Sequence, residues 1–250
     1  MIKALLVECR KSRYRKLWII VVALIGVQLL WELYSFRNMD DYDLAQGWLA
    51  CLYHFPVLNA IFMPVITAVI ASKLSDIEHK GQTLKLLETV MPAARLFDAK
   101  LLCGACYVLF VILLQVGVML LTGYIKGFAG SAPLDRMGYY LLFTFCVTVT
   151  LLLLQQILSL LFVNQMVSLT VGLIGGFGGL FSMYLPPWFS KMTPWGYYGV
   201  LMLTGMDWNR ETRIVAYYWS EIDWTGFFIL VLAFLVIYCT GRILFVRKEM

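Results

Sequence analysis

The chain has 250 residues, of which 61% are hydrophobic and 14% are charged, and its mean hydropathy is +0.80. One soluble core could not bury this much apolar side chain, so the composition excludes an ordinary soluble domain and predicts a membrane protein. The scarcity of charged residues also excludes disorder and nucleic-acid binding as main properties.

The chain opens with a basic segment whose apolar residues follow helical spacing. Ile2, Leu5, Leu6 and Cys9 stand at positions i, i+3, i+4 and i+7, which is typical of an amphipathic helix. Because a long apolar run follows directly, we expect this helix to lie flat at the membrane interface.

Six apolar stretches follow, each of about 20 residues, which is the length that a helix needs to cross a bilayer core. They occupy residues 17–36, 52–72, 101–124, 139–163, 166–185 and 227–245. Each is apolar on every face and lacks the alternation of a membrane barrel strand. The predicted fold is therefore an all-α integral membrane protein with six transmembrane helices, and residues 1–250 are expected to form a single transmembrane domain.

The positions of lysine and arginine predict the orientation of the spans. Six of these residues precede the first span, five lie between the second and third spans, and three close the chain. The opposite side carries the other six, together with eight carboxylates between Asp40 and Asp223. Both termini and the loop of residues 73–100 are therefore expected on the cytoplasmic side.

The loop of residues 73–100 has the strongest local signals among the segments between spans. Thr83 can begin a short helix and Pro92 ends it. This helix would carry Leu84 and Leu87 on one stripe. It is suited to lie in a groove of a cytoplasmic partner, and the alternative is a helix that lies flat on the lipid.

Four glycines in the stretch 166–185 form two overlapping pairs with a spacing of four residues. They are Gly172, Gly175, Gly176 and Gly179. Small residues at this spacing allow two helix backbones to approach closely. The contact is expected either within the chain or with a second membrane subunit.

Residues 186–224 form an aromatic outer segment before the last span. It holds five of the eight tryptophans, among them Trp195 and Trp208, and aromatics at this density are typical of a membrane interface. Residues 196–206 are apolar but too few to cross, so we expect a re-entrant segment. The aromatic segment is interpreted as an anchor or as an outer lid, and its carboxylates are Asp207, Glu211, Glu221 and Asp223.

Signatures of catalysis and of metal binding are absent from the sequence. There is no Gly-Lys dipeptide, so no Walker A loop can form, and neither H-E-x-x-H nor G-x-S-x-G occurs. Cys103 and Cys106 form a C-x-x-C pair, but neither histidine is placed to complete a zinc site. We expect a chain without enzymatic activity, without a metal and without an internal disulfide.

Few polar groups occur within the predicted spans. Glu32 lies one turn from the outer end of the first span, where we expect it to reach the interface or to pack. The glutamines of the spans are expected to hydrogen-bond between helices, and they are Gln28, Gln115, Gln155 and Gln156. A proton or ion relay needs more ionisable groups than these, so any energy for transport is expected to come from another subunit.

The loop between the second and third spans resembles a known family. It reads Glu78-His79-Lys80-Gly81-Gln82-Thr83-Leu84-Lys85-Leu86-Leu87, then Met91-Pro92, Arg95 and Lys100. This is similar to the E-x-x-x-G-T, L-L, P-x-x-R, K pattern of type-two ABC exporter permeases, with Gln82 as a departure where the family usually has threonine. The resemblance implies a coupling helix that docks on an ATPase, with these matching positions: Glu78, Gly81, Thr83, Leu84, Leu87, Pro92 and Arg95.

The chain looks most like the small permeases of lantibiotic self-protection systems. It is similar to them in its length, in its opening Met1 to Glu8 and in the absence of a large outer domain. This resemblance implies export of an antimicrobial peptide from the bacterial cytoplasmic membrane. It also implies a second, unlike permease and a partner ATPase that binds ATP and Mg²⁺, with no cofactor on this chain. The alternatives are an exporter of bacitracin, of other drugs or of lipid, and a non-transporting accessory protein.

Under this interpretation two sets of residues acquire roles. The four glycines of the stretch 166–185 would pack against the second permease. An outer gate or a contact with the peptide would be formed by Trp195, Trp208, Asp207, Glu211, Glu221 and Asp223.

Overall fold

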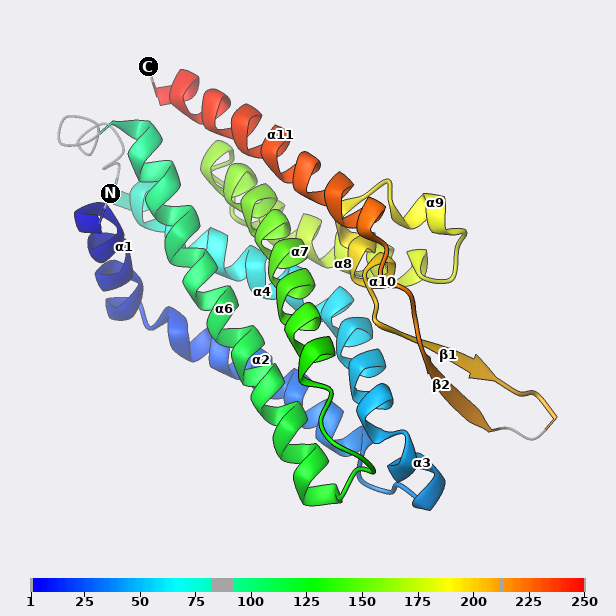
Figure 1. Ribbon diagram of the computed structural model, residues 1–250. Helices are drawn as coiled ribbons and strands as arrows, with labels where there is room; N and C mark the ends of the chain where they lie inside the picture. Colours follow the sequence, from blue (N-terminus) through cyan, green and yellow to red (C-terminus); the bar gives the residue numbers. More distant parts are fainter. Residues whose placement is uncertain (1, 82–91, 212–213, 250) are drawn as a thin grey trace.

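Long helices make up most of the chain in a computed structural model that describes residues 2–81, 92–211 and 214–249. The elements in chain order are α1 (Ile2–Tyr14), α2 (Leu17–Ser35), α3 (Asp41–Ala45), α4 (Gly47–Gly81), α6 (Ala93–Lys126), α7 (Leu134–Leu161), α8 (Met166–Ser182), α9 (Pro187–Ser190), η1 (Pro194–Gly196), α10 (Tyr197–Val200), β1 (Thr204–Trp208), β2 (Val215–Trp219) and α11 (Trp224–Glu249). Figure 1 shows the long helices in one bundle, with the short helices and the strand pair at its side.

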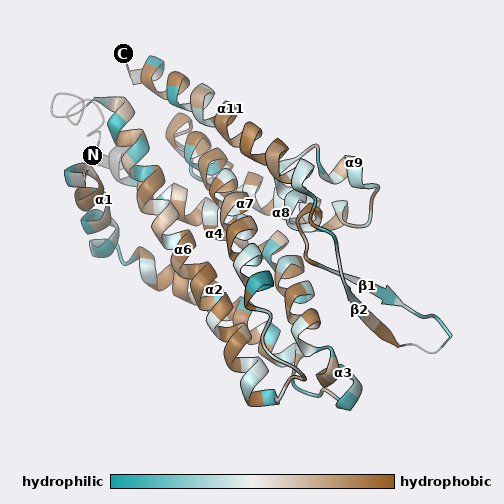
Figure 2. Ribbon diagram, viewed as in Figure 1, coloured by the Kyte–Doolittle hydropathy of each residue, from teal (hydrophilic) through white to brown (hydrophobic). Residues whose placement is uncertain are grey.

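In the part of the chain that the structure describes, five helices are long and apolar enough to cross a membrane, namely α2, α4, α6, α7 and α11. They coincide with five of the six predicted spans, and Figure 2 shows apolar residues along most of their length. The predicted span of residues 166–185 is present as α8, an apolar helix of 17 residues. Because 17 residues rise only about 25 Å, the crossing of α8 stays a prediction.

Helices α4 and α6 extend beyond the predicted spans. The helix α4 continues to Gly81 instead of ending at residue 72, and α6 begins at Ala93 instead of residue 101. Apolar sequence marks only the part of a helix that lies in hydrocarbon, whereas the backbone hydrogen bonds continue into the polar interface. Pro56 and Pro64 lie inside α4, where each removes a backbone hydrogen bond, and α4 changes direction along its course (Figure 1).

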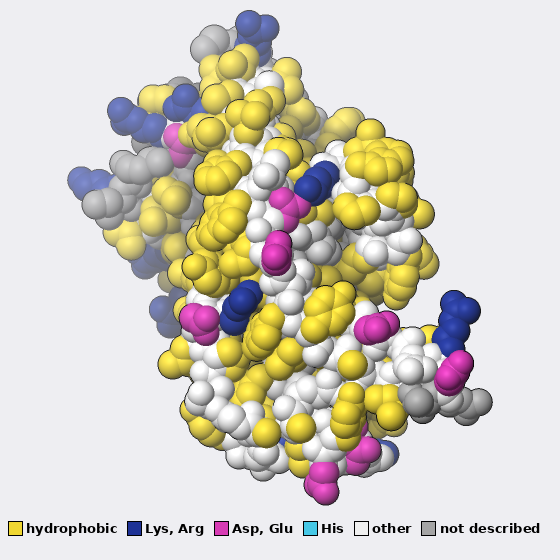
Figure 3. Space-filling view, turned by 45° about the vertical axis from the view of Figure 1, so that its right-hand side comes forward, with side chains coloured by type: hydrophobic (Ala, Val, Ile, Leu, Met, Phe, Trp, Pro, Cys, Tyr) yellow, Lys and Arg dark blue, Asp and Glu magenta, His cyan; other side chains and the backbone are white. Residues whose placement is uncertain are grey.

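The two ends of the bundle differ in what they carry. Both chain termini, the last turns of α4 and the first turns of α6 lie at one end, whereas α3 and the strand pair lie toward the other (Figure 1). On the face shown in Figure 3, most acidic side chains lie toward the end with the strand pair. This arrangement places the termini and both ends of the predicted coupling loop on one side of the bundle.

A network of buried amides joins four helices at the centre of the bundle. Gln28 of α2, Asn59 of α4, Gln115 of α6 and Tyr140 of α7 are all at most 2% exposed. Gln28 Nε2 and Gln115 Nε2 each donate to Asn59 Oδ1 at 2.8 Å. The Tyr140 hydroxyl donates to Gln115 Oε1 at 2.7 Å. The predicted interhelical role of Gln28 and Gln115 is therefore confirmed.

The other two glutamines also bond between helices. Gln156 Nε2 of α7 donates to the carbonyl of Phe97 in α6 at 2.9 Å. Gln155 of α7 lies 2.8 Å from the Ser168 hydroxyl of α8. Buried polar groups thus align α7 with both of its neighbours, which apolar packing alone would leave free to slide.

Glu32 follows Gln28 by one turn on the buried face of α2. Its side chain is 1% exposed, and neither carboxylate oxygen has a hydrogen-bond partner among the described residues. The expectation that Glu32 reaches the interface is therefore wrong, and the alternative of a packed carboxyl holds.

The strand pair corrects the all-α prediction for the outer segment. β1 and β2 form an antiparallel hairpin in which Thr204 lies opposite Trp219 and Trp208 lies opposite Val215. Residues 196–206, predicted as a re-entrant segment, form the last residue of η1, α10 and the first three residues of β1, and their re-entry into the membrane stays a prediction. The missed signal is the cluster of β-branched and aromatic residues on both sides of a short polar turn, a pattern that favours a hairpin.

Candidate coupling and substrate sites

The helix α1 packs against the bundle through polar side chains. Glu8 and Ser12 are each 2% exposed, whereas Leu6 and Val7 face outward. The apolar stripe predicted from Ile2, Leu5, Leu6 and Cys9 is thus only partly the face that contacts the bundle. A buried carboxylate on this face needs a partner of opposite charge.

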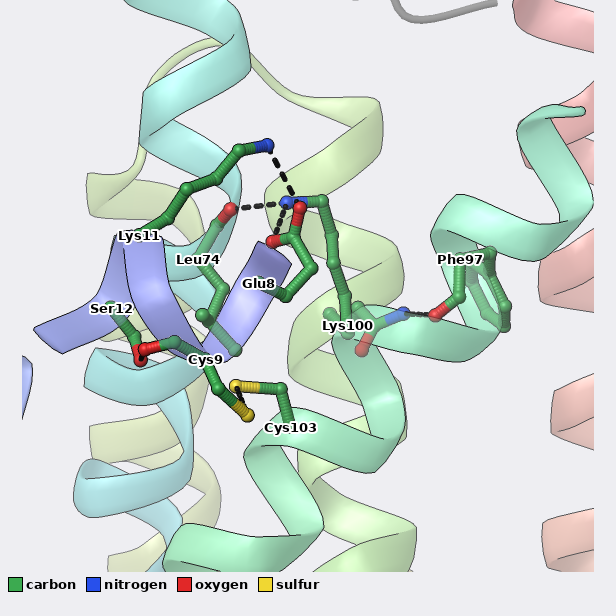
Figure 4. Close-up of polar contacts among 9 residues, drawn as sticks. Glu8, Cys9, Lys11, Ser12, Leu74, Phe97, Lys100 and Cys103 are labelled. Atoms are coloured by element: carbon green, nitrogen blue, oxygen red, sulfur yellow. Dashed lines mark hydrogen bonds and ion pairs between the residues drawn. The ribbon is translucent and has the colours of Figure 1, made fainter. Parts of the chain in front are cut away.

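That partner is Lys100 of α6, as Figure 4 shows. Lys100 Nζ lies 3.0 Å from Glu8 Oε2 and also donates to the carbonyl of Leu74 in α4. Lys11 Nζ lies 2.9 Å from the other Glu8 oxygen. Lys100 is fully buried. One ammonium group therefore joins α1, the late part of α4 and the early part of α6.

Further contacts tie the first turns of α6 to the last helix. Asp98 accepts a hydrogen bond from the Tyr238 hydroxyl of α11 at 2.7 Å, and Arg242 Nε lies 3.5 Å from the same oxygen. The Phe97 carbonyl accepts from Gln156 of α7. We call Glu8, Leu74, Phe97, Asp98 and Lys100 the α6 hub.

The α1 side of α6 also brings two thiols together. Cys9 Sγ lies 3.6 Å from Cys103 Sγ (Figure 4), and all six cysteines are free. The Ser12 and Tyr107 hydroxyls lie 3.0 Å apart one turn further on. Within the described ranges, no group of three or more potential ligand residues could hold a metal ion.

Four of the seven predicted coupling residues lie at the described ends of α4 and α6. Glu78 and Gly81 belong to the last turns of α4, Pro92 directly precedes α6, and Arg95 is exposed in its first turn. Thr83, Leu84 and Leu87 lie outside the described residues. The sequence does not reveal the roles of Glu8 and Asp98, because their partners are 92 and 140 positions away in the chain.

The four glycines of α8 face neighbours within the same chain. A Cβ at Gly172 would lie 2.9 Å from the Pro64 carbonyl oxygen of α4, and one at Gly176 would lie 3.1 Å from that of Ala60. A Cβ on Gly179 would lie 2.5 Å from the carbonyl oxygen of Trp195, and Gly175 faces the indole ring of Trp195. Of the two contacts that the sequence allowed, the glycines therefore make the one within the chain, against α4 and Trp195.

A second permease cannot use the same close approach while these neighbours occupy it. The opposite face of α8 remains available, and it carries exposed apolar side chains at Leu173, Ile174, Phe177 and Phe181. Trp195 packs against Gly175 and Gly179 of α8. Its indole nitrogen is buried and has no hydrogen-bond partner in the described part of the chain.

The hairpin is attached to the start of α4. Gln46 Nε2 donates to the Val215 carbonyl at 3.0 Å, and its Oε1 accepts from the Tyr217 amide at 2.8 Å. The Tyr217 hydroxyl lies 3.0 Å from His54 Nε2. Burial, followed by the nearby Tyr53 and Asp43, raises the pKa of Tyr217 to about 12. The phenol therefore stays protonated and remains a hydrogen-bond donor at neutral pH.

An outer cavity of 340 Å³ lies between α4, α8, α10 and the hairpin. Aromatic and aliphatic side chains line it, including Tyr53, Tyr184 and Met202. Thr204 also lines it, and its buried hydroxyl has no partner among the described residues. The cavity therefore combines apolar walls with an unused polar group, which is typical of ligand sites.

Lys191 and Asp223 form an ion pair at the edge of this cavity. Burial works against ionisation of Asp223, but the hydrogen bonds from Lys191 and from the Gly226 amide outweigh it, so the pKa of Asp223 is lowered. The Gly226 amide donates to Asp223 Oδ1 at 2.7 Å and thereby caps α11.

The remaining predicted outer residues lie away from the cavity. Asp207 and Trp208 end β1, Glu211 lies in the turn beyond it, and all three are exposed. Glu221 is exposed between the hairpin and α11. The structure therefore does not gather the six predicted outer residues into one site, and of these six only Asp223 lines the outer cavity.

Comparison with known proteins gives one family. The family model described as ABC-2 family transporter protein matches residues 4–179. The match includes most of α1 and of α8, the whole of α2, α4, α6 and α7, and the whole of the predicted coupling loop. No curated protein matches the chain.

Proposed function

We propose that this chain, which belongs to the ABC-2 family of transporter proteins, expels an antimicrobial peptide of the lantibiotic type. The family identifies it as a membrane permease of an ABC exporter. In this proposal it works in the cytoplasmic membrane of a bacterium and confers immunity or resistance. Its partners are ABC ATPase subunits, which bind ATP and Mg²⁺, and a second, non-identical permease. This chain binds no cofactor.

The outer cavity is the observation that best supports the proposed substrate. Its apolar walls and the free hydroxyl of Thr204 suit a segment of an amphipathic peptide. Asp207 and Glu211 lie outside the cavity, further along the hairpin that lines it, and are exposed. A cationic peptide concentrates at a membrane surface before it inserts, so exposed carboxylates at this level would attract it.

The α6 hub supports the proposed coupling. The loop between α4 and α6 would receive the movement of the ATPase when ATP binds. Lys100 links α6 to α1 and α4, and Asp98 links it to α11. A displacement of the first turns of α6 would therefore reach several helices at once, because these polar contacts join α6 directly to α1, α4 and α11.

The substrate is tested by survival of a sensitive bacterium that expresses the complete transporter. We expect Asp207→Asn with Glu211→Gln to weaken resistance to a cationic lantibiotic and to leave resistance to a neutral hydrophobic drug unchanged. The matched control is Asp41→Asn with Asp135→Asn, two exposed carboxylates outside the hairpin. Equal effects of both pairs, or no protection against any peptide by the parent, would favour a general drug, bacitracin or lipid exporter.

Coupling is tested by Leu84→Asp with Leu87→Asp. Charges in an apolar contact should separate the ATPase from the permease, because an unpaired carboxylate is costly to bury. Co-purification in mild detergent measures the association, and a monodisperse elution profile controls for folding. Retained association with retained export would contradict the coupling role. Absence of any ATPase in the parent preparation would instead favour a non-transporting accessory protein.

A further inference from the structure

A second cavity, of 590 Å³, lies at the junction of α1 and α2. We call it the elbow groove. Its lining combines three cations with aromatic and aliphatic side chains: Arg10, Arg13, Tyr14, Lys16, Trp18 and Ile19. Among the residues that the structure describes, no acidic side chain lines it. It is separate from the α6 hub, because Glu8 faces the opposite, buried side of α1.

Within the described ranges the cations of the elbow groove have no acidic partner, unlike their neighbour Lys11. Lys11 pairs with Glu8. Among the described residues neither Arg13 nor Lys16 has an ion pair, and Arg10 has only the Tyr14 ring, 5.9 Å from its guanidinium carbon. Three positive charges around one cavity repel each other, so an anion between them would relieve the repulsion.

The backbone holds this arrangement in an unusual conformation. Lys16 has φ 53° and ψ 31°, and it is the one non-glycine residue with positive φ in the described part of the chain. This left-handed conformation is unfavourable for a residue with a side chain. It ends α1 and starts α2 within two residues, which places Lys16 and Arg13 at the same cavity. Strained backbone of this kind gathers at functional sites.

The position of the elbow groove indicates what kind of anion fits. The first membrane-spanning helix begins at Leu17, so the groove lies at the membrane interface. Tyr14 is 74% exposed and Trp18 is 50% exposed, and such aromatics favour the headgroup level. Leu6 faces outward on α1. A ligand here meets cations and apolar surface together, which a phosphate with an attached acyl chain satisfies and a free phosphate does not.

We propose that the elbow groove binds the headgroup of an anionic phospholipid from the leaflet on the side of the termini. The phosphodiester would accept hydrogen bonds from the guanidinium groups of Arg10 and Arg13 and from the Lys16 ammonium. The glycerol and the first acyl carbons would lie along Trp18 and Ile19. This site is independent of the exported substrate, and it would fix α1 relative to the membrane.

The experiment uses the purified full chain in mild detergent. Short-chain phosphatidylglycerol, short-chain phosphatidylcholine and inorganic phosphate are each titrated, and native mass spectrometry counts the retained lipid. We expect selective retention of one phosphatidylglycerol. Each cation near a membrane surface contributes about fivefold in affinity, so Arg10→Gln with Arg13→Gln and Lys16→Gln should weaken binding on the order of a hundredfold.

The matched control removes three exposed cations outside the groove at the same end of the bundle, through Lys3→Gln, Lys73→Gln and Arg247→Gln. This control should retain the lipid. An equal loss of lipid binding in both triple variants would show that the lipid is held by diffuse electrostatic attraction and not by the elbow groove. Equal competition by inorganic phosphate would make it a free-anion site. Unchanged lipid binding in the groove variant would show that these three cations do not hold the headgroup.

A folding defect in the triple variant would not end the test. Arg13→Gln alone leaves Lys16 and its backbone intact, and it is expected to lower the affinity for phosphatidylglycerol about fivefold. Unchanged affinity in this single variant, with the parent retaining lipid, would overturn the assigned groove.

Discussion

The two ends of the bundle are held together by different forces. At the end with the termini, the buried Lys100 ammonium and the Asp98 carboxylate join α6 to α1, α4 and α11. At the end with the hairpin, aromatic contacts and one partly exposed ion pair among the described residues surround a cavity of 340 Å³. The first end is suited to move as a unit, and the second is suited to change shape around a ligand.

The largest effect is expected from breaking the α6 hub. Lys100→Met leaves Glu8 buried with Lys11 as its partner, and loss of one member of a buried ion pair costs about 3 kcal/mol. Thermal unfolding in detergent should show a clearly lower Tm and weaker export even where the ATPase stays bound. Lys73→Met, an exposed lysine of α4, should change neither. A Tm loss no larger than that of this control would contradict the role of the hub.

The next effect is expected at the contact between α8 and Trp195. A Cβ on Gly179 would lie 2.5 Å from the Trp195 carbonyl oxygen, whereas one on Gly178 would have nothing within 4 Å. Gly179→Ala should therefore destabilise the chain by about 1–3 kcal/mol. Gly178→Ala should stabilise it by up to about 1 kcal/mol, because alanine favours a helix.

Unfolding of both alanine variants compares the two faces of α8 directly. Equal Tm values would show that α8 does not pack as described. Cross-linking to the proposed second permease adds the complementary result. If Gly178→Leu weakens the cross-link and the chain stays folded, the second permease contacts the exposed face of α8.

The sequence predicts the helices well because long apolar runs leave the backbone few alternatives in a membrane. It predicts their ends less well, as in α4 and α6, where polar turns continue the helix outside the hydrocarbon. The hairpin was missed because the apolar residues 196–206 are compatible with either a short helix or a strand. The α6 hub could not be found, since pairing of Glu8 with Lys100 depends on how α1 folds back onto α6.

Gln28 and Glu32 are buried polar side chains one turn apart on α2, and they differ in whether they have hydrogen-bond partners. Gln28 is hydrogen-bonded, whereas both Glu32 oxygens lack a partner among the described residues. Gln28→Met should therefore lower stability by about 1–2 kcal/mol, and Glu32→Met should raise it by a similar amount. Tm values of both variants measure this. A loss of stability in Glu32→Met would show that the carboxyl has a partner in the membrane.

The smallest effect is expected at the hairpin end, from the ion pair of Asp223 and Lys191. Because the folded state lowers the pKa of Asp223 below its ordinary 3.8, this contribution is fully present above that value and is lost as the pH falls below it. Its size is less than about 1 kcal/mol, because both side chains are partly exposed, and salt reduces it further.

Asp223→Asn separates the charge of this pair from the cap of α11. Asparagine keeps an oxygen for the Gly226 amide, so its Tm should fall slightly at neutral pH and should match the parent once the pH lies below the lowered pKa of Asp223, where the carboxyl is protonated. Asp223→Ala loses the cap as well and should be about 1 kcal/mol less stable at either pH. An Asn variant whose deficit persists in acid would show that shape, and not charge, holds this end together.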